Sequence, residues 1–279
     1  MVADPVPDDP VRSAARGDTR QGLPLTGERT LPGIPDERYW FVRHVVAYRA
    51  ARAWLDEVAD DAATTGGPTV LDAGCGEGYG LAILRALGAA RVVGIDLDGA
   101  TIAHAEATYA APDPGIEVAQ AELRAIPLPD AAVDLTLSLQ VIEHLHDIPG
   151  YLRELQRVTR AGGLVAISTP NRLTFSPGRR HPTNPFHTVE FTATELNGLL
   201  TRAGLEVFAR LGSHHAGRIA EVEAARGTSI PDLLTELDPS RWPDWLRTLV
   251  HSTEETDFVL TSDHLDTSLD LLLACRVRP

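Results

Sequence analysis

A single α/β domain with a mostly parallel sheet is the fold that this sequence predicts. Short apolar segments alternate with amphipathic ones from residue 69 onward, and glycines cluster directly behind the first apolar segment. The 279 residues, with a hydrophobic content of 43%, suffice for one large core. Strands that alternate with helices build βαβ units, whose helices cover both faces of the sheet.

The N-terminal part is expected to hold a disordered lead-in and one long helix. Residues 1–24 are rich in Pro, Asp and Arg and lack the apolar core of a secretory signal, which predicts disorder. The domain is expected to span 25–279 and to begin with a helix over 36–56. Apolar residues recur at helical spacing in that helix, at Phe41, Val45, Tyr48 and Leu55.

Strands and helices then alternate along the chain. Strands are predicted in the segments "TVLDA", "RVVGIDLD", "IEVAQA", "VDLTLSL" and "LVAIST". Helices are predicted in "GYGLAILRALGA", "GATIAHAEATYA" and "IPGYLRELQRVTRAG". A further helix and strand lie in "ATELNGLLTRAGLEVFARLG", and "TSLDLLLACRVR" is expected to be the last strand.

Residues 213–266 interrupt this alternation. They are rich in Asp, Pro, Trp and His and show weak periodicity. We interpret the segment as an insertion near the mouth of the active site. An ordinary surface excursion explains the same composition equally well.

The charge and the cysteine content limit which classes of partner and which cellular compartment the sequence predicts. The net charge is −14 and the 25 basic residues are scattered, which argues against nucleic acid or an anionic membrane as a partner. No apolar run is long enough to span a membrane. A disulfide between Cys75 and Cys275 is possible, but a chain of this size does not need one, and free thiols predict a cytoplasmic location. A monomer and a homodimer both remain open.

The segment "TVLDAGCGEGYG" (69–80) places a glycine-rich turn directly after a strand. Gly74 and Gly76 fit the first two glycines of a nucleotide-binding fingerprint, whereas Tyr79 stands at the third position. Asp96 ends the next strand, 22 residues after Gly74, where an acid can hold ribose hydroxyls. This spacing predicts a cofactor that contains adenosine.

Two acids in the same segment select among such cofactors. Asp72 and Glu77 would repel a diphosphate at close range, at a cost on the order of a few kcal/mol in a partly dry site. They would instead attract the ammonium and sulfonium groups of S-adenosylmethionine, which carries no phosphate. The alternative is that the two acids only cap the following helix, and Glu77 alone could do so.

At this point the sequence resembles a known family. The segments "VLDAGCGEGYG", "VVGIDLD", "IPLPDAAVDL" and "VIEHLHD" resemble, in order, the signature blocks of class I S-adenosylmethionine-dependent methyltransferases over about residues 65–211. The resemblance implies a Rossmann-like, seven-stranded, mostly parallel sheet with an antiparallel last strand. It also implies a set of cofactor contacts: Gly74 and Gly76 at the methionine part, Asp96 at the ribose, Leu97 at the adenine, Glu122 and Leu123 at the adenine amine, and Gln140 beside the methyl donor.

A second resemblance extends to the flanks of the chain. The segments "LTGERTLPGIPDERYWFVRHVVAY", "STPNRLTFSPGR", "NPFHTVEFTATEL" and "LDTSLDLLLACRVRP" resemble the mycobacterial sugar 1-O-methyltransferases of methylmannose polysaccharide synthesis. This resemblance implies a short oligosaccharide as substrate, methylated at the anomeric hydroxyl of an already 3-O-methylated mannoside.

Methyl transfer to a hydroxyl needs a positioned base, which typically contributes about 10²–10⁴-fold in rate. His144 in "VIEHLHD" follows the fourth strand by a few residues and is the candidate base. The alternative is that His144 packs under the loop. Glu143 could orient His144, face the substrate, or be a surface acid.

The sequence gives weaker evidence for binding roles of other polar residues. Arg43 could clamp the carboxylate of the methionine part, although a solvated helix face is the more usual place for an Arg. His181 and His187 do not match a zinc spacing, so no metal site is predicted from them. Some sugar methyltransferases use Mg²⁺, but no acid cluster in the sequence demands it. The rival functions are methylation of a phenol or amine, a nicotinamide-dependent oxidoreductase, and a donor-binding protein without turnover.

Overall fold

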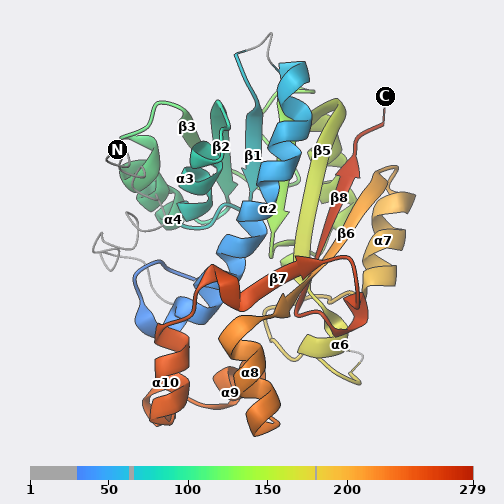
Figure 1. Ribbon diagram of the computed structural model, residues 1–279. Helices are drawn as coiled ribbons and strands as arrows, with labels where there is room; N and C mark the ends of the chain where they lie inside the picture. The colour runs from blue at the N-terminus through green and yellow to red at the C-terminus, as the bar shows by residue number, and fades with distance from the viewer. Residues whose placement is uncertain (1–29, 63–65, 180, 279) are drawn as a thin grey trace, which may run out of the picture.

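A computed structural model describes residues 30–62, 66–179 and 181–278 (Figure 1). The lead-in predicted over 1–24 lies outside the described residues. One sheet of eight strands forms the centre of the molecule, in the order β3-β2-β1-β4-β5-β8-β6-β7. The strands are β1 (Thr69–Ala73), β2 (Arg91–Asp96), β3 (Ile116–Gln120), β4 (Val133–Leu139), β5 (Thr159–Pro170), β6 (Glu206–His215), β7 (Phe258–Thr261) and β8 (Asp270–Arg276).

The pairing confirms the predicted α/β class. Strands β1 to β5 pair in parallel, and β8 runs antiparallel between β5 and β6, as expected for the last strand. The sheet has one strand more than predicted. The additional β7 pairs antiparallel with the end of β6 and comes from the segment read as an irregular insertion. Its four residues were too short a run to show a strand period.

Helices cover both faces of the sheet. The helices are α2 (Arg38–Ala62), α3 (Tyr79–Ala86), α4 (Gly99–Ala105), α5 (Ile148–Val158), α6 (Arg172–Phe175), α7 (Ala193–Arg202), α8 (Gly217–Arg226), α9 (Ile230–Glu236) and α10 (Asp244–His251). A π-helical turn, η3 (Glu106–Ala110), continues α4, and short 3₁₀ turns are η1 (Pro35–Glu37), η4 (Ile142–His144), η5 (Pro239–Arg241), η6 (Glu255–Asp257) and η7 (Leu265–Thr267).

Two apolar cores follow from the alternation of side chains along the strands. In β5, Leu164 belongs to the core under α2 and α3, whereas the next residue, Val165, belongs to the core under α5 and α7. The predicted helix over 36–56 is present and longer, because the apolar stripe of α2 continues through Val58 to Ala62.

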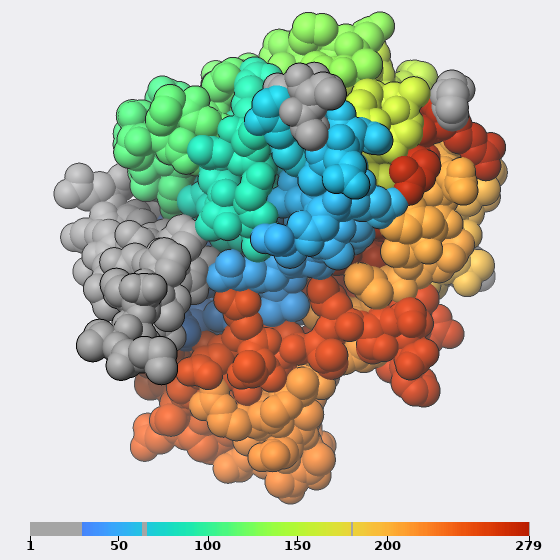
Figure 2. Space-filling view, turned by 45° about the horizontal axis from the view of Figure 1, so that its top comes forward, coloured from blue at the N-terminus to red at the C-terminus, as the bar shows by residue number. Residues whose placement is uncertain are grey.

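The segment after β6 is largely helical. Figure 1 shows α8, α9 and α10 beyond one end of the sheet, beside α6, which directly follows β5. In Figure 2 this part of the chain, drawn in orange, projects as a lobe at the bottom of the view. The lobe therefore lies at the end where the parallel strands finish. Within the described ranges, no helix has both the length and the apolarity needed to cross a membrane.

Candidate active site

A cavity of about 720 Å³ opens at the carboxyl ends of the parallel strands, where ligands bind in open α/β sheets. Its walls come from α2, from the turns after β1, β2, β3 and β4, and from β5 and β8. Every residue predicted for the cofactor or the chemistry lines it except Asp72 and Glu143. The predicted residues in the wall are Arg43, Gly74, Gly76, Glu77, Asp96, Leu97, Glu122, Leu123, Gln140 and His144.

The glycine turn after β1 needs glycine for steric reasons. Gly74 has φ +88°, and a Cβ there would lie 2.4 Å from Cγ2 of Val141. Gly76 has φ +55°, and a Cβ there would meet no atom within 4 Å. The backbone at Gly76 therefore borders open space in the cavity wall, where a ligand can approach it closely.

Asp96 connects this turn to the end of β2. One carboxylate oxygen accepts a hydrogen bond from the Gly76 amide at 3.0 Å, and the other accepts from the Asp98 amide at 3.0 Å. Each carboxylate oxygen has a second lone pair, so both can also accept from hydroxyls of a ligand. Asp96 thus fixes the turn and presents an acceptor pair to the cavity.

Asp72 lies behind the turn rather than at the cavity surface. Its side chain is fully buried, and Oδ2 accepts a hydrogen bond from the Tyr48 hydroxyl at 3.0 Å. Oδ1 has no hydrogen-bond partner among the described residues. Burial raises the pKa of the Asp72 carboxyl to about 7, although the hydrogen bond from Tyr48 acts in the opposite direction. Sequence spacing could not show that a tyrosine of α2 covers this acid.

Glu77 borders the cavity, but its carboxylate is turned toward the helix after β2. Oε1 accepts a hydrogen bond from the Tyr109 hydroxyl at 3.1 Å, and Oε2 lies 2.9 Å from Nε2 of His104. Tyr109 belongs to the π-helical turn η3, and its ring leaves no room for a Cβ at Gly78. The structure thus gives Glu77 partners within the fold in addition to its place in the cavity wall.

The exposed end of the cavity carries the residues predicted for the adenine. Leu97 is 65% exposed, and Glu122 pairs with Arg124 at 2.7 Å on the surface. Leu123 lies between them and lines the same wall. An exposed leucine beside an open cavity gives an apolar face on which a flat ring can lie.

At the opposite end, His144 ends the short 3₁₀ turn η4 after β4. Its Nδ1 donates a hydrogen bond to the Phe186 carbonyl at 3.2 Å, since a carbonyl oxygen can only accept. In the neutral imidazole this hydrogen bond makes Nε2 the proton acceptor. The ring of His187 lies edge-on to that of His144, with 5.0 Å between centroids.

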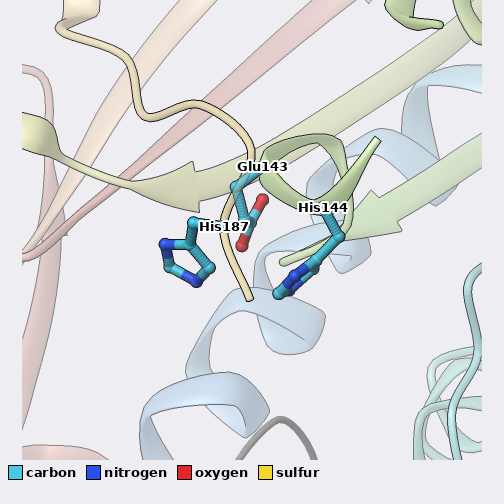
Figure 3. A group of neighbouring side chains, drawn as sticks. All are labelled: Glu143, His144 and His187. Atoms are coloured by element: carbon cyan, nitrogen blue, oxygen red, sulfur yellow. The ribbon is translucent and has the colours of Figure 1, made fainter. Parts of the chain in front are cut away.

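Glu143 is buried beside His144 and does not line the cavity. It accepts a hydrogen bond from the Thr169 hydroxyl at 2.9 Å, and its backbone carbonyl accepts from the Thr188 amide at 2.7 Å. These bonds tie η4 to β5 and to the loop that carries His187. Figure 3 shows the Glu143 carboxylate close to the two imidazole rings.

Potential ligand atoms of Glu143, His144 and His187 lie within 4.8 Å of one another, a spacing that could hold a metal ion. Each also has partners in the protein. Nδ1 of His187 donates to Glu190 at 2.9 Å, and Nε2 accepts from the Asn184 amide at 3.1 Å. Mg²⁺ prefers oxygen ligands, and this group offers one carboxylate and two imidazoles. The arrangement of these three residues is therefore better explained as neighbours that hold the His144 ring in place than as a magnesium site.

A buried ion pair closes the floor of the cavity. Both Nε and Nη2 of Arg43 bind the carboxylate of Asp270, which opens β8. Asp270 also accepts from the Gln140 side chain at 3.4 Å, and Gln140 has the left-handed φ of +57°. The guanidinium of Arg43 therefore binds a carboxylate of the protein itself, whereas the sequence predicted that it binds a carboxylate of the ligand.

Sequence reasoning did not identify Asp270, Glu190 or Ser168 as part of this site. Asp270 interrupts an apolar run in the last predicted strand, and that interruption was the available signal. Glu190 is buried in a loop 47 positions beyond Glu143, so only the fold brings it to the site. Ser168 reads as an ordinary strand residue.

Known proteins share this architecture. A family model described as a methyltransferase domain matches residues 71–167. The chain is 44% identical over 262 residues to a probable S-adenosylmethionine-dependent methyltransferase of Mycolicibacterium smegmatis, covering 92% of this chain and 96% of that protein. It is 43% identical over 265 residues to a probable S-adenosylmethionine-dependent methyltransferase of Mycobacterium tuberculosis, covering 92% of this chain and 90% of that one.

Solved structures agree on the fold. An S-adenosylmethionine-dependent methyltransferase from Mesorhizobium loti superposes with a TM-score of 0.52 at 23% identity, over 83% of this chain and 97% of that chain. One from Thermotoga maritima superposes with a TM-score of 0.55 at 16% identity, over 86% and 93%. The Rossmann-like class I methyltransferase fold implied by the sequence is thereby confirmed, with eight strands instead of seven.

Proposed function

The chain belongs to the S-adenosylmethionine-dependent methyltransferases, with S-adenosylmethionine as cofactor, and from this premise we propose that it methylates a sugar hydroxyl. The proposed acceptor is the anomeric hydroxyl of a short, 3-O-methylated mannoside. The resemblance of the flanking segments to sugar 1-O-methyltransferases supports this choice.

The cavity fits the cofactor at several points. The space beside Gly76 is open, so the turn leaves room for a ligand against its backbone. We propose that Asp96 accepts hydrogen bonds from the ribose hydroxyls and that Leu97 and Leu123 flank the adenine. When bound, S-adenosylmethionine supplies a methyl group on a cationic sulfur that is a good leaving group.

His144 is the proposed general base, and the tautomer set by its hydrogen bond is the observation that supports this role. Because Nδ1–H donates to the Phe186 carbonyl, Nε2 holds the lone pair that can take the acceptor's proton. In the proposed step the hydroxyl oxygen forms a bond to the methyl carbon as the carbon–sulfur bond breaks, and its electron pair leaves with sulfur. The hydroxyl proton passes to Nε2 of His144. Glu143 acts as a positioning residue that ties η4 to β5.

A second imidazole in the cavity is a poorer base. His44 lines the wall, but burial lowers its pKa to about 4, so it is neutral and binds protons weakly near neutral pH. Nδ1 of His44 lies 3.1 Å from the Tyr79 hydroxyl, which also lies 3.3 Å from the Thr30 hydroxyl. His44 is therefore suited to holding the wall together.

The proposal is tested by incubating the protein with methyl-labelled S-adenosylmethionine and a panel of acceptors. The panel contains mannosides with and without 3-O-methyl groups, other hexosides, a phenol and an amine. We expect label in a 3-O-methylated mannoside, with NMR placing the new methyl group on the anomeric oxygen. Label in the phenol or amine, and in none of the sugars, would replace the proposed acceptor.

A further inference from the structure

The carboxylate in the methionine part of the cofactor is an anion that needs hydrogen-bond donors in the cavity wall. Arg43 is the donor that the sequence predicts, but its guanidinium binds Asp270 in the floor of the cavity. A second carboxylate at Arg43 would lie close to that of Asp270, and like charges at short range are unfavourable. The carboxylate of the cofactor therefore has to be bound by another group.

His44 follows Arg43 on α2 and lines the cavity beside the glycine turn. It lies one helical turn before Tyr48, whose ring leaves no room for a Cβ at Gly80, just after that turn. Nδ1 of His44 lies 3.1 Å from the hydroxyl of Tyr79, the residue before Gly80. His44 therefore borders the part of the cavity in which the methionine part is expected to lie.

The neighbours of Nδ1 determine what the other ring nitrogen of His44 can do. Nδ1 also lies 3.3 Å from the Thr30 hydroxyl, and the hydroxyls of Thr30 and Tyr79 lie 3.3 Å apart. When Thr30 donates to Tyr79 and Tyr79 donates to Nδ1, both hydroxyl protons are used and the neutral ring carries its hydrogen on Nε2. Nε2 has no hydrogen-bond partner among the described residues, and the ring lines the cavity. His44 thus offers an unused N–H donor to a ligand.

The charge state of His44 is compatible with this role. Burial lowers its pKa to about 4, so the imidazole is neutral near pH 7, and a neutral N–H still donates a strong hydrogen bond to a carboxylate. Other side-chain donors of the wall have partners in the protein. The Tyr48 hydroxyl donates to Asp72, and Arg124, near the end of the cavity expected to hold the adenine, pairs with Glu122.

We propose that Nε2–H of His44, rather than the guanidinium of Arg43, binds the carboxylate in the methionine part of the cofactor. Thr30 and Tyr79 fix the orientation of the imidazole, and Arg43 stays in its buried pair with Asp270. This inference rests on the proposed place of the cofactor in the cavity, and it does not depend on which acceptor is methylated.

Two ligands separate a contact with the carboxylate from a general effect on the cavity wall. One is S-adenosylhomocysteine, and the other is its decarboxylated analogue, which keeps the adenosine and the ammonium group. Calorimetry gives the Kd of both for the wild type, for His44→Leu, and for His44→Gln, whose amide N–H can replace Nε2–H. His251→Leu is the matched control, because His251 pairs with Asp36 on the surface and does not line the cavity.

The wild type should bind S-adenosylhomocysteine at least about tenfold more tightly than the analogue. His44→Leu should raise the Kd for S-adenosylhomocysteine about tenfold to a hundredfold, the range for a hydrogen bond to a charged group, and leave the Kd for the analogue within about twofold. His44→Gln should keep most of the preference, and His251→Leu all of it. Tyr79→Phe provides a second test should His44→Leu not fold, because it removes the hydroxyl that orients the ring and should lower the preference a fewfold.

Three results would overturn the inference. Unchanged affinity of His44→Leu for S-adenosylhomocysteine would show that another group binds the carboxylate. Equal losses of affinity for both ligands would leave His44 with a role in the wall only. Equal affinity of the wild type for the two ligands would show that the protein does not recognise the carboxylate. If the binding results agree with the inference while the wild type methylates no sugar, the proposed acceptor fails and the role of His44 stands.

Discussion

The two halves of the cavity are built in different ways. The half proposed to hold the cofactor comes from two adjacent turns, in which Gly74, Gly76 and Asp96 lie within 23 residues and the Gly76 amide donates a hydrogen bond to the Asp96 carboxylate. The half that contains the proposed base brings together Arg43, His144 and Asp270 from α2, η4 and β8, which lie far apart in the sequence. A site made of neighbouring turns can be found by its spacing, whereas a site assembled by the fold cannot.

A substitution in the half of the cavity that contains Arg43 and Asp270 should have the largest effect on the free energy of unfolding. Arg43→Ala leaves the Asp270 carboxylate buried without its cation, and losing one partner of a buried pair costs about 3–5 kcal/mol. Urea unfolding followed by circular dichroism measures the loss. Arg52→Ala is the matched control, because Arg52 of the same helix pairs with Asp56 on the surface and should cost at most about 1 kcal/mol. Similar losses for the two variants would contradict the role given to the buried pair.

The buried acid behind the glycine turn should make stability depend on pH. The pKa of Asp72 is about 7 in the folded protein, above its ordinary value of 3.8, so the folded state binds more protons between these values. Its contribution is complete below about pH 4 and is lost as the pH rises toward 7, a few kcal/mol in total. Asp72→Asn removes this term and can keep the acceptor for Tyr48.

The measurement is the free energy of unfolding of both proteins from pH 5 to pH 8. The stability of the Asp72→Asn variant relative to the wild type should rise from pH 5 to about pH 7 and level off above it. A difference that is the same at every pH would show that Asp72 is ionised in the folded protein throughout. Tyr48→Phe sharpens the test, since losing its hydrogen bond should raise the pKa of Asp72 further.

In the cofactor half, Asp96→Ala should weaken binding without abolishing it. Removing hydrogen bonds to a charged acceptor costs about 1.5–3 kcal/mol, so the Kd for S-adenosylhomocysteine should rise roughly tenfold to a hundredfold. Calorimetry measures this. Asp98→Ala is a useful control, because Asp98 caps α4 two positions on and does not line the cavity. Unchanged affinity in Asp96→Ala would remove this residue from the ribose role.

The smallest effect is expected at His187, which we infer to hold the ring of His144 in place. His187→Gln should lower kcat a fewfold and shift its pH profile, while leaving the KM for the cofactor unchanged. His187→Phe can preserve the stack on Phe175 but not the hydrogen bond to Glu190. Equal pH profiles for wild type and both variants would leave His187 with a packing role only.

The sheet and the glycine turn could be predicted from the sequence because each depends on residues that are close together in the chain. Short apolar runs mark β1, β2 and β4, and the positive φ of Gly74 needs a glycine at that point. The surroundings of His144 depend on Glu190 and on the Phe186 carbonyl, which reach it through a loop without a recognisable period. Strand β7 and the lobe after β6 were missed as structure because their elements are short and separated by polar turns.

The most direct test of the account is His144→Ala, assayed for turnover and for cofactor binding in the same preparation. We expect kcat to fall by about 10²–10⁴-fold and the Kd for S-adenosylhomocysteine to stay within about twofold, because the base serves only the acceptor. His181→Ala, an exposed imidazole outside the cavity, should match the wild type in both. Near wild-type turnover in His144→Ala would contradict the assignment of His144 as the base.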